Sequence, residues 1–246
     1  MDVLTIAISG CSCAGKTTFV ALLKNLLPSE TAIFLHADMF GVPLSQMPIF
    51  EGFRDCDSRS SYRFEDIRAA IDYAKVHRRY PPQYQASEAL DGDIAKYKSN
   101  ILPGFLDEVK ANMQCIRWEK YKAIVVVDGL LLLHDESLRA RFDVMLLLRA
   151  SRAEAWRRRS LRYNGAEHER EFWQTETYFK SCVWRNYEKE HCFLFPDGNV
   201  EAELISSSAS SNEFHVAVQP STCTAVLEDV QRWAIGTLVQ ECKGLQ

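Results

Sequence analysis

One segment near the start of the chain, GCSCAGKT, constrains the fold more than any other. It spans Gly10 to Thr17 and matches the pattern G-x-x-x-x-G-K-[ST] in full. An apolar run over residues 3–8 precedes it and predicts a buried strand, while residues 17–27 carry apolar side chains at helical spacing. A tight turn between a strand and a helix directs backbone N–H groups and the helix N-terminus at phosphate oxygens. We therefore predict a loop that binds a nucleoside triphosphate.

Two side chains of this loop are expected to bind different parts of the nucleotide and its metal ion. Lys16 is expected to reach the β and γ phosphates as a point charge, and the Thr17 hydroxyl is expected to bind Mg²⁺. The cofactors predicted in this way are Mg²⁺ and either ATP or GTP. The residues predicted to hold the nucleotide are Gly10, Cys11, Ser12, Cys13, Ala14, Gly15, Lys16, Thr17 and Thr18.

Two aspartates follow predicted strands. Asp128 comes directly after the apolar run 123–127, and Asp38 follows the shorter run 32–35. Parallel strands place their carboxyl ends at one edge of a sheet, so both acids should lie near the phosphate loop. We expect Asp128 beside Mg²⁺ and Asp38 as the acceptor of a proton from an attacking hydroxyl.

A strongly basic helix is predicted from Ser151 toward Arg162. Arginine stabilises the charge that builds up on a transferring phosphoryl group. Arg158 and Arg162 lie at positions i and i+4 and so share one helix face. We predict that these two arginines belong to a lid that spans residues 151–190.

The rest of the pattern alternates strands and helices, which favours an α/β fold with a parallel sheet. Further strands are predicted over 143–148 and 214–218, helices over 64–77, within 102–121, over 167–190 and over 225–242, and loops over 41–60 and 204–212. The length of 246 residues fits a single domain, 1–246. Within it, residues 41–122 are expected to form an insertion on the substrate side.

The composition excludes several classes of protein. Apolar residues make up 47% and charged residues 25%, which is ordinary for a globular protein. The net charge of −4 argues against broad nucleic-acid binding. The longest apolar stretch, 123–133, is too short to span a membrane, and the N-terminus has no basic leader. Eight irregularly spaced cysteines indicate reduced thiols, so we expect a cytoplasmic protein that could also occur in the nucleus.

Several of these segments together resemble a known family. The segments ISGCSCAGKTT, HADMF, VVVDGLLLL and WRRRSLR look like those of the nucleoside and nicotinamide riboside kinases of the phosphate-loop group. The segments RDCDS and YFKSCVWRNY bring the likeness closer to nicotinamide riboside kinases, and the length is similar to fungal-type members. The resemblance implies transfer of phosphate from ATP to the riboside, which forms nicotinamide mononucleotide for NAD biosynthesis.

The resemblance also implies a fold and a set of site residues. The fold is a phosphate-loop, NTPase-like α/β fold with a five-stranded parallel sheet, a lid and a substrate-binding insertion. Asp38 matches the acid that meets the riboside 5′-hydroxyl, Asp57 the acid that holds the ribose hydroxyls, and Asp128 the acid beside Mg²⁺. Arg158 and Arg162 match lid arginines, and Tyr178 and Cys56 fall where the family contacts the nicotinamide ring. The expected partner is a small-molecule substrate, without nucleic acid or membrane, for a monomer or homodimer.

The chain departs from the family pattern at four positions. Met39 stands where a second acid is common, Cys56 replaces an aromatic residue, Lys180 replaces an acid and Arg185 replaces a proline. Two alternatives therefore stay open: a kinase for another small hydroxyl metabolite such as uridine or pantothenate, and a nucleotide-binding module with weakened catalysis. A regulatory GTPase is disfavoured because no N-K-x-D element is present.

Overall fold

The computed structural model describes residues 2–84, 103–162, 171–203, 208–211, 214–223 and 226–245. Its main sheet has the order β2-β5-β1-β6-β8-β7. The strands are β1 (Val3–Gly10), β2 (Ala32–His36), β5 (Ala123–Gly129), β6 (Val144–Leu148), β7 (Ser208–Ser211) and β8 (Phe214–Val218). The first five in spatial order pair in parallel, which confirms the predicted five-stranded parallel sheet.

The sixth strand corrects one expectation. Residues 204–212 were predicted to form a loop, but β7 pairs antiparallel with β8 at the end of the sheet. Its sequence, SASS, carries no strand signal. Pairing at an open sheet edge uses backbone N–H and C=O groups, so a neighbouring strand can order a segment whose side chains do not favour it.

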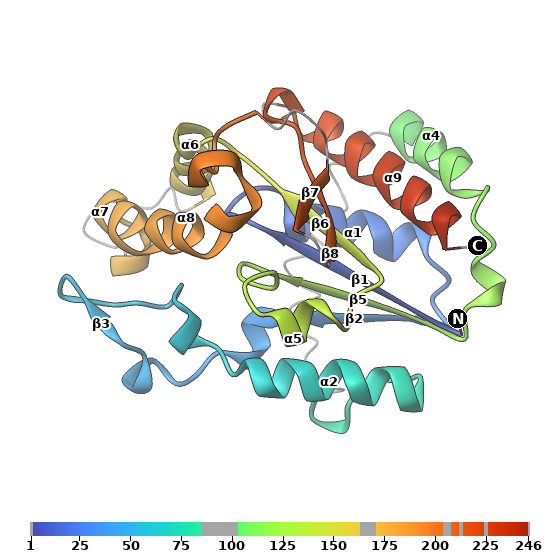
Figure 1. Cartoon of the computed structure of the whole chain (residues 1–246), viewed down its shortest axis with the longest axis horizontal. Coiled ribbons are helices and arrows are strands. Elements are labelled where there is room, and N and C mark those ends of the chain that lie inside the picture. The colour runs from blue at the N-terminus through green and yellow to red at the C-terminus, as the bar shows by residue number, and fades with distance from the viewer. Residues whose placement is uncertain are drawn as a thin grey trace.

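Helices cover both sides of the sheet. The longer ones are α1 (Lys16–Leu26), α2 (Phe64–His77), α4 (Pro103–Met113), α6 (Arg152–Arg162) and α9 (Leu227–Gly244). Figure 1 shows α2 on one side of the sheet and the adjacent helices α4 and α9 on the other. Along the described parts of the chain, none of the helices is long and apolar enough to cross a bilayer.

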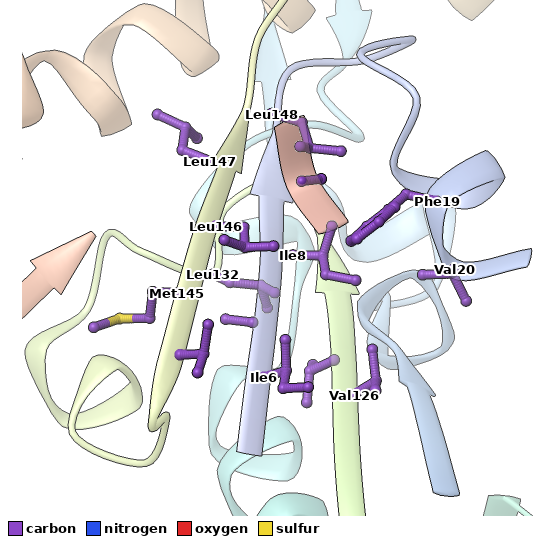
Figure 2. Close-up of a cluster of buried hydrophobic side chains, with 14 of the residues drawn as sticks. Ile6, Ile8, Phe19, Val20, Val126, Leu132, Met145, Leu146, Leu147 and Leu148 are labelled. Atoms are coloured by element: carbon purple, nitrogen blue, oxygen red, sulfur yellow. The ribbon is translucent and has the colours of Figure 1, made fainter. Parts of the chain in front are cut away.

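The core follows from the apolar strands. Every residue of β5 is buried, as a central strand between two helical layers requires. In Figure 2, Ile6 of β1 lies beside Val126 of β5, and Ile8 of β1 lies beside Phe19 of α1. These contacts fix α1 against the sheet, and the loop that begins α1 is fixed with it.

The predicted helix over 167–190 is more complex than expected. Residues 163–170 lie outside the described part. From there the chain forms α7 (Glu176–Tyr178), a π-helical stretch over Phe179–Trp184 and α8 (Arg185–His191). Single π-helical turns rotate a helix face and are frequent near functional sites. Here the π-helical turn lies between Tyr178 and Asn186. The Tyr178 side chain forms a hydrogen bond with Asp57, and the Asn186 side chain forms one with Asp55.

The segment 41–122, expected to form an insertion on the substrate side, contributes to several parts of the structure. Residues 41–60, predicted to be a loop, contain a small hairpin, β3 (Ile49–Phe50) and β4 (Phe53–Arg54). After it, Cys56, Asp57 and Tyr62 reach the central cavity. Helix α2 instead packs on β5 and β2, and α4 packs on α9. Residues 85–102 lie outside the described part.

Candidate active site

A cavity of about 820 Å³ opens at the carboxyl edge of the sheet, and it brings the predicted residues together. The described residues that line it are Ser12, Cys13, Gly15, Lys16, Thr17, Thr18, Asp38, Cys56, Asp57, Tyr62, Asp128, Gly129, Leu130, Arg157, Arg158, Arg159, Leu161, Arg162, Trp173 and Leu227. They come from the phosphate loop and the start of α1, the ends of β2 and β5, the segment after β4, α6, the helical turn Phe172–Gln174 and the start of α9. Its volume lies within the range of small-ligand sites.

The phosphate loop depends on two glycines. Gly10 has φ of +151°, and a Cβ there would lie 2.1 Å from the Leu148 carbonyl oxygen, so no larger residue fits beside β6. Gly15 has φ of +100° and forms the left-handed N-cap of α1. The loop therefore turns tightly into the helix, with the N-terminal N–H groups of α1 at the cavity.

Lys16 lies inside the loop. Its Nζ donates hydrogen bonds of 2.9 Å to the Gly10 carbonyl and 2.8 Å to the Cys11 carbonyl. These two hydrogen bonds hold the ammonium group over the loop. From this position it can reach a phosphate bound in the loop. Cys11 and Ala14, also predicted to hold the nucleotide, have buried side chains and can contribute only backbone groups. Burial raises the pKa of the Cys11 thiol to about 11, so this thiol stays protonated.

Asp128 lies at the end of β5, and Thr17 lines the same cavity from the start of α1. The Nδ1 atom of His36 forms a hydrogen bond with Oδ1 of Asp128. Register explains this pair, because His36 and Asp128 are direct partners in the β2–β5 ladder. The role of His36 was not predicted from the sequence. The only sequence signal was its place at the end of a predicted strand.

Asp38 follows β2 and opens into the cavity. Burial among the surrounding protein atoms raises the pKa of its carboxyl above the usual range, and the charge of Asp128 raises it further. The charges of Lys16, His36 and Arg162 act in the opposite direction. An aspartate with a raised pKa is a better proton acceptor than an ordinary one. Asp38 therefore lines the same cavity as Lys16 and Asp57, with a carboxyl suited to accepting a proton.

Asp57 lines the same cavity from the segment after β4, and its side chain is buried. Its Oδ2 atom accepts a hydrogen bond of 2.6 Å from the Tyr178 hydroxyl, and that hydroxyl in turn accepts one of 2.9 Å from the Cys56 N–H. Burial raises the pKa of the Asp57 carboxyl, and the nearby positive charge of Arg159 lowers it in part. Asp38 also acts on Asp57, so the two acids are close enough to interact.

Tyr178 does not occupy the place expected of it. Its side chain is fully buried and is absent from the cavity lining. Its ring lies nearly perpendicular to those of Phe53 and Phe172, at centroid distances of 5.7 and 5.4 Å. Tyr178 therefore supports Asp57 from behind and does not present a ring to a substrate in the cavity. The sequence pattern could not distinguish these two orientations.

A third acid, Asp55, lies beneath Asp57 and was not singled out from the sequence. It accepts hydrogen bonds of 3.0 and 2.8 Å from Nδ2 of Asn186 and one of 3.0 Å from the Asp57 N–H. Asp55 thus fixes the backbone that presents Asp57. Its signal was present in the segment RDCDS, where the two acids are separated by a single residue.

The arginines of α6 lie over the phosphate loop. Arg158 donates from Nε to Glu154 and, at 3.3 Å, from Nη1 to the Cys13 carbonyl. Hydrogen bonds from Arg157 and Arg158 lower the pKa of Glu154 to about 2, so this acid stays charged and orients both arginines. Arg162 lines the cavity as predicted.

Arg159, which was not chosen from the sequence, is the buried arginine of this helix. Its Nη1 donates to the Ser12 hydroxyl at 2.7 Å, and its Nη2 donates to the Trp173 carbonyl at 2.6 Å. It therefore ties the phosphate loop to the segment after α6. Three adjacent arginines gave no sequence signal for which one would turn inward.

Two departures from the family pattern lie away from the cavity. Lys180 is exposed and forms an ion pair with Glu176 at 2.5 Å. Arg185 lies over the Phe50 ring at 3.9 Å from its centroid. Neither residue lines the cavity. Neither position therefore places a positive charge against an acceptor bound there.

Comparison with known proteins is consistent with this geometry. The chain is 29% identical over 205 residues to a nicotinamide riboside kinase of Saccharomyces cerevisiae, which covers 82% of this chain and 83% of the relative. It is 28% identical over 244 residues to a nicotinamide riboside kinase of Schizosaccharomyces pombe, which covers 96% of each. No family model matches the chain. A solved protein of Thermus thermophilus aligns over 98% of both chains at 17% identity, but its TM-score of 0.38 is too low to bear on the fold.

Proposed function

We propose that this chain is an ATP-dependent nicotinamide riboside kinase, which phosphorylates the riboside 5′-hydroxyl to form nicotinamide mononucleotide. The observation that carries the proposal is the meeting of three groups in one cavity: the Lys16 loop, the proton acceptor Asp38 and the acceptor-side acid Asp57. Similarity to fungal nicotinamide riboside kinases over most of the chain supports the choice of acceptor.

The proposed reaction follows from the order of these groups along the cavity. Asp57, which is held in place by Tyr178, accepts hydrogen bonds from the vicinal ribose hydroxyls. Asp38 takes the proton from the 5′-hydroxyl while the hydroxyl oxygen attacks the γ-phosphorus of ATP. The bond from that phosphorus to the oxygen of the β-phosphate breaks, and ADP leaves. Lys16, Arg158 and Arg162 balance the charge on the transferring group.

The residues present also fit Mg²⁺. Oxygen ligands suit this ion, and in kinase sites it is held by one or two protein groups together with substrate phosphates. Thr17 and Asp128 supply a hydroxyl and a carboxylate in the cavity, and His36 orients that carboxylate. Among the described residues no group of three His, Cys, Asp or Glu side chains could hold a metal, which agrees with an ion bound largely through the nucleotide. When bound there, the ion would offset the negative charge of the phosphates.

A panel of acceptors tests the proposal. ADP release is measured with nicotinamide riboside, uridine and pantothenate, each with ATP and with GTP, and the product is identified by mass. We expect the highest kcat/KM for nicotinamide riboside with ATP. A higher value for uridine or pantothenate assigns another metabolite kinase, and nucleotide binding without turnover on any acceptor assigns a binding module.

The eight unpaired cysteines fit the reducing cytoplasm, where we place the reaction.

A further inference from the structure

The reaction proposed above does not use His191, a fully buried histidine at the end of α8. Its Nε2 atom lies 3.4 Å from Oγ of Ser9, the residue before Gly10. Neither Ser9 nor His191 has any exposed surface, and 182 positions of sequence separate them. This buried polar contact joins α8 to β1, the strand that leads into the phosphate loop.

The surroundings of the His191 ring decide which of its nitrogens carries the proton. Nδ1 lies 3.0 Å from the Tyr187 carbonyl oxygen, which can only accept a hydrogen bond, so Nδ1 is the protonated nitrogen. Burial lowers the pKa of His191 to about 4, so the ring is neutral at neutral pH and Nε2 keeps a lone pair. In the contact between the two side chains, the Ser9 hydroxyl therefore donates and His191 accepts.

The Ser9 hydroxyl has a second acceptor. Its Oγ donates to the carbonyl oxygen of Leu130 at 3.3 Å, in the turn that follows β5. Ser9 is also the ladder partner of Gly129, so this hydroxyl joins the ends of two neighbouring strands where the phosphate loop and the turn after Asp128 begin. One hydroxyl proton is shared between two acceptors, so the position of the His191 ring helps to set how the hydroxyl holds the turn.

The turn after β5 also touches the segment that carries the proposed proton acceptor. Gly129 lines the cavity, and a Cβ there would lie 2.5 Å from the Cβ of Ala37, the residue before Asp38. Contacts as close as this transmit a shift of the turn to its neighbour. The Ser9 hydroxyl thus lies where the segments that supply the reactive groups meet.

We propose that His191 is a positioning residue for phosphate transfer: by accepting the Ser9 hydroxyl, it aligns the phosphate loop with the acid-bearing turns at the ends of β2 and β5. The inference rests on the proposed function, because it concerns the alignment of the same cavity. His191 itself does not line that cavity. A misplacement of about 1 Å in an active site can lower the rate by about 10²-fold, so a contact outside the cavity can still control the rate.

Two substitutions separate the two nitrogens of the ring. A glutamine side chain reaches the position of Nε2 and can accept from Ser9, whereas an asparagine side chain ends near the position of Nδ1 and keeps only the contact with Tyr187. We expect His191→Asn to lower kcat by about 10- to 100-fold and His191→Gln to keep most of the activity. The KM for nicotinamide riboside should stay close to that of the wild type in both, because the hydrogen bonds of Asp57 do not involve His191.

Ser9 supplies the second half of the test. Ser9→Ala should lower kcat as His191→Asn does, and a variant that combines both substitutions should lose little more, because both remove the same contact. Calorimetry with a nonhydrolysable ATP analogue adds a measurement that needs no turnover. The affinity for this analogue should fall in Ser9→Ala and in His191→Asn, and His191→Gln should restore it.

Ile235→Ala is the matched control for a loss of stability, because Ile235 is equally buried but lies in α9, outside the cavity lining. It should lower the melting temperature without changing kcat or the affinity for the ATP analogue. The inference is overturned, while the proposed function stands, if His191→Asn keeps wild-type kcat, if His191→Asn and His191→Gln lose equally, or if the losses of Ser9→Ala and His191→Asn multiply in the combined variant. If the wild type does not phosphorylate nicotinamide riboside, the proposed function is overturned, and the calorimetric comparison decides the inference by itself.

Discussion

The Tyr178 hydroxyl donates a 2.6 Å hydrogen bond to Oδ2 of Asp57, across a separation of 121 positions in the sequence. The same hydroxyl accepts the Cys56 N–H, so one phenol fixes both the carboxylate and the backbone of the ribose-side segment. Asp57 is buried, and a buried carboxyl group is costly unless it is hydrogen-bonded. The position of Asp57 therefore depends on a helix that the sequence places far away.

Tyr178→Phe removes this hydroxyl and keeps the ring. We expect the KM for nicotinamide riboside to rise by roughly tenfold, with the KM for ATP unchanged, because only the acceptor-side acid loses its support. Unfolding should become easier by about 2 kcal/mol, because the hydroxyl makes two hydrogen bonds worth about 1 kcal/mol each. Kinetics and urea denaturation measure the two effects. An equal rise in both KM values would show a general disruption of the cavity instead.

Lys16→Ala removes the cation that lies over the phosphate loop. We expect kcat to fall by roughly 10² or more, because the charge on the transferring phosphoryl group is then poorly balanced. The backbone of the loop is set by Gly10 and Gly15, so the fold should persist, which circular dichroism checks. Turnover close to wild type would contradict the role given to this loop.

Asp38→Asn keeps the shape of the side chain and removes its ability to accept a proton. We expect ATP binding to persist and phosphoryl transfer to fall by about 10² to 10⁴. If ATP affinity is lost while bound substrate turns over normally, Asp38 has a metal-binding or a structural role instead.

The pH profile adds a second reading of the same residue. Burial and Asp128 raise the pKa of Asp38, so the carboxylate that accepts the proton is present above that raised pKa and is lost as the pH falls through it. The acid limb of kcat/KM should therefore lie at higher pH than an aspartate of ordinary pKa gives. The residual activity of Asp38→Asn should lack this limb.

Asp57→Ala separates recognition of the ribose from the chemistry. The wild type should prefer the riboside over its 2′-deoxy form by about 10² or more in kcat/KM, because the deoxy form leaves a buried acceptor unpaired. The variant should lose this preference while slow ATP hydrolysis stays as it was. If the ratio of the two substrates does not change, Asp57 only supports its turn, and an acceptor without ribose becomes the better hypothesis.

His191 predicts a dependence of stability on pH. It is fully buried, and its Nδ1 lies 3.0 Å from the Tyr187 carbonyl. Burial lowers its pKa from 6.5 to about 4. Between these values the unfolded chain binds a proton that the folded chain does not, so the free energy of unfolding should fall as the pH falls from 6.5 to 4, by on the order of 3 kcal/mol. Urea denaturation across this range measures the slope, and His191→Gln should flatten it.

The parts of the fold with strong local signals were predictable. The motif from Gly10 to Thr17, the buried strands and the acids at their ends are local in sequence, since a glycine turn and an apolar run specify their own backbone. Parallel pairing then brings strand ends to one edge, so the meeting of Lys16, Asp38 and Asp128 followed from topology. The edge strand β7 did not follow, because its pairing depends on the open edge of β8 and its serines carry no signal.

The sequence by itself determined the phosphate loop, the parallel sheet and the strand-end acids, because each depends on residues that are neighbours in the chain. Only the tertiary structure decided which way the side chains of α6, α7 and α8 turn. It put Arg159 inside against Ser12, turned Tyr178 behind Asp57 and paired Asp55 with Asn186. A helix offers several faces to its surroundings, and which face is buried depends on how it packs against segments more than 100 residues away, so no local pattern carries that information.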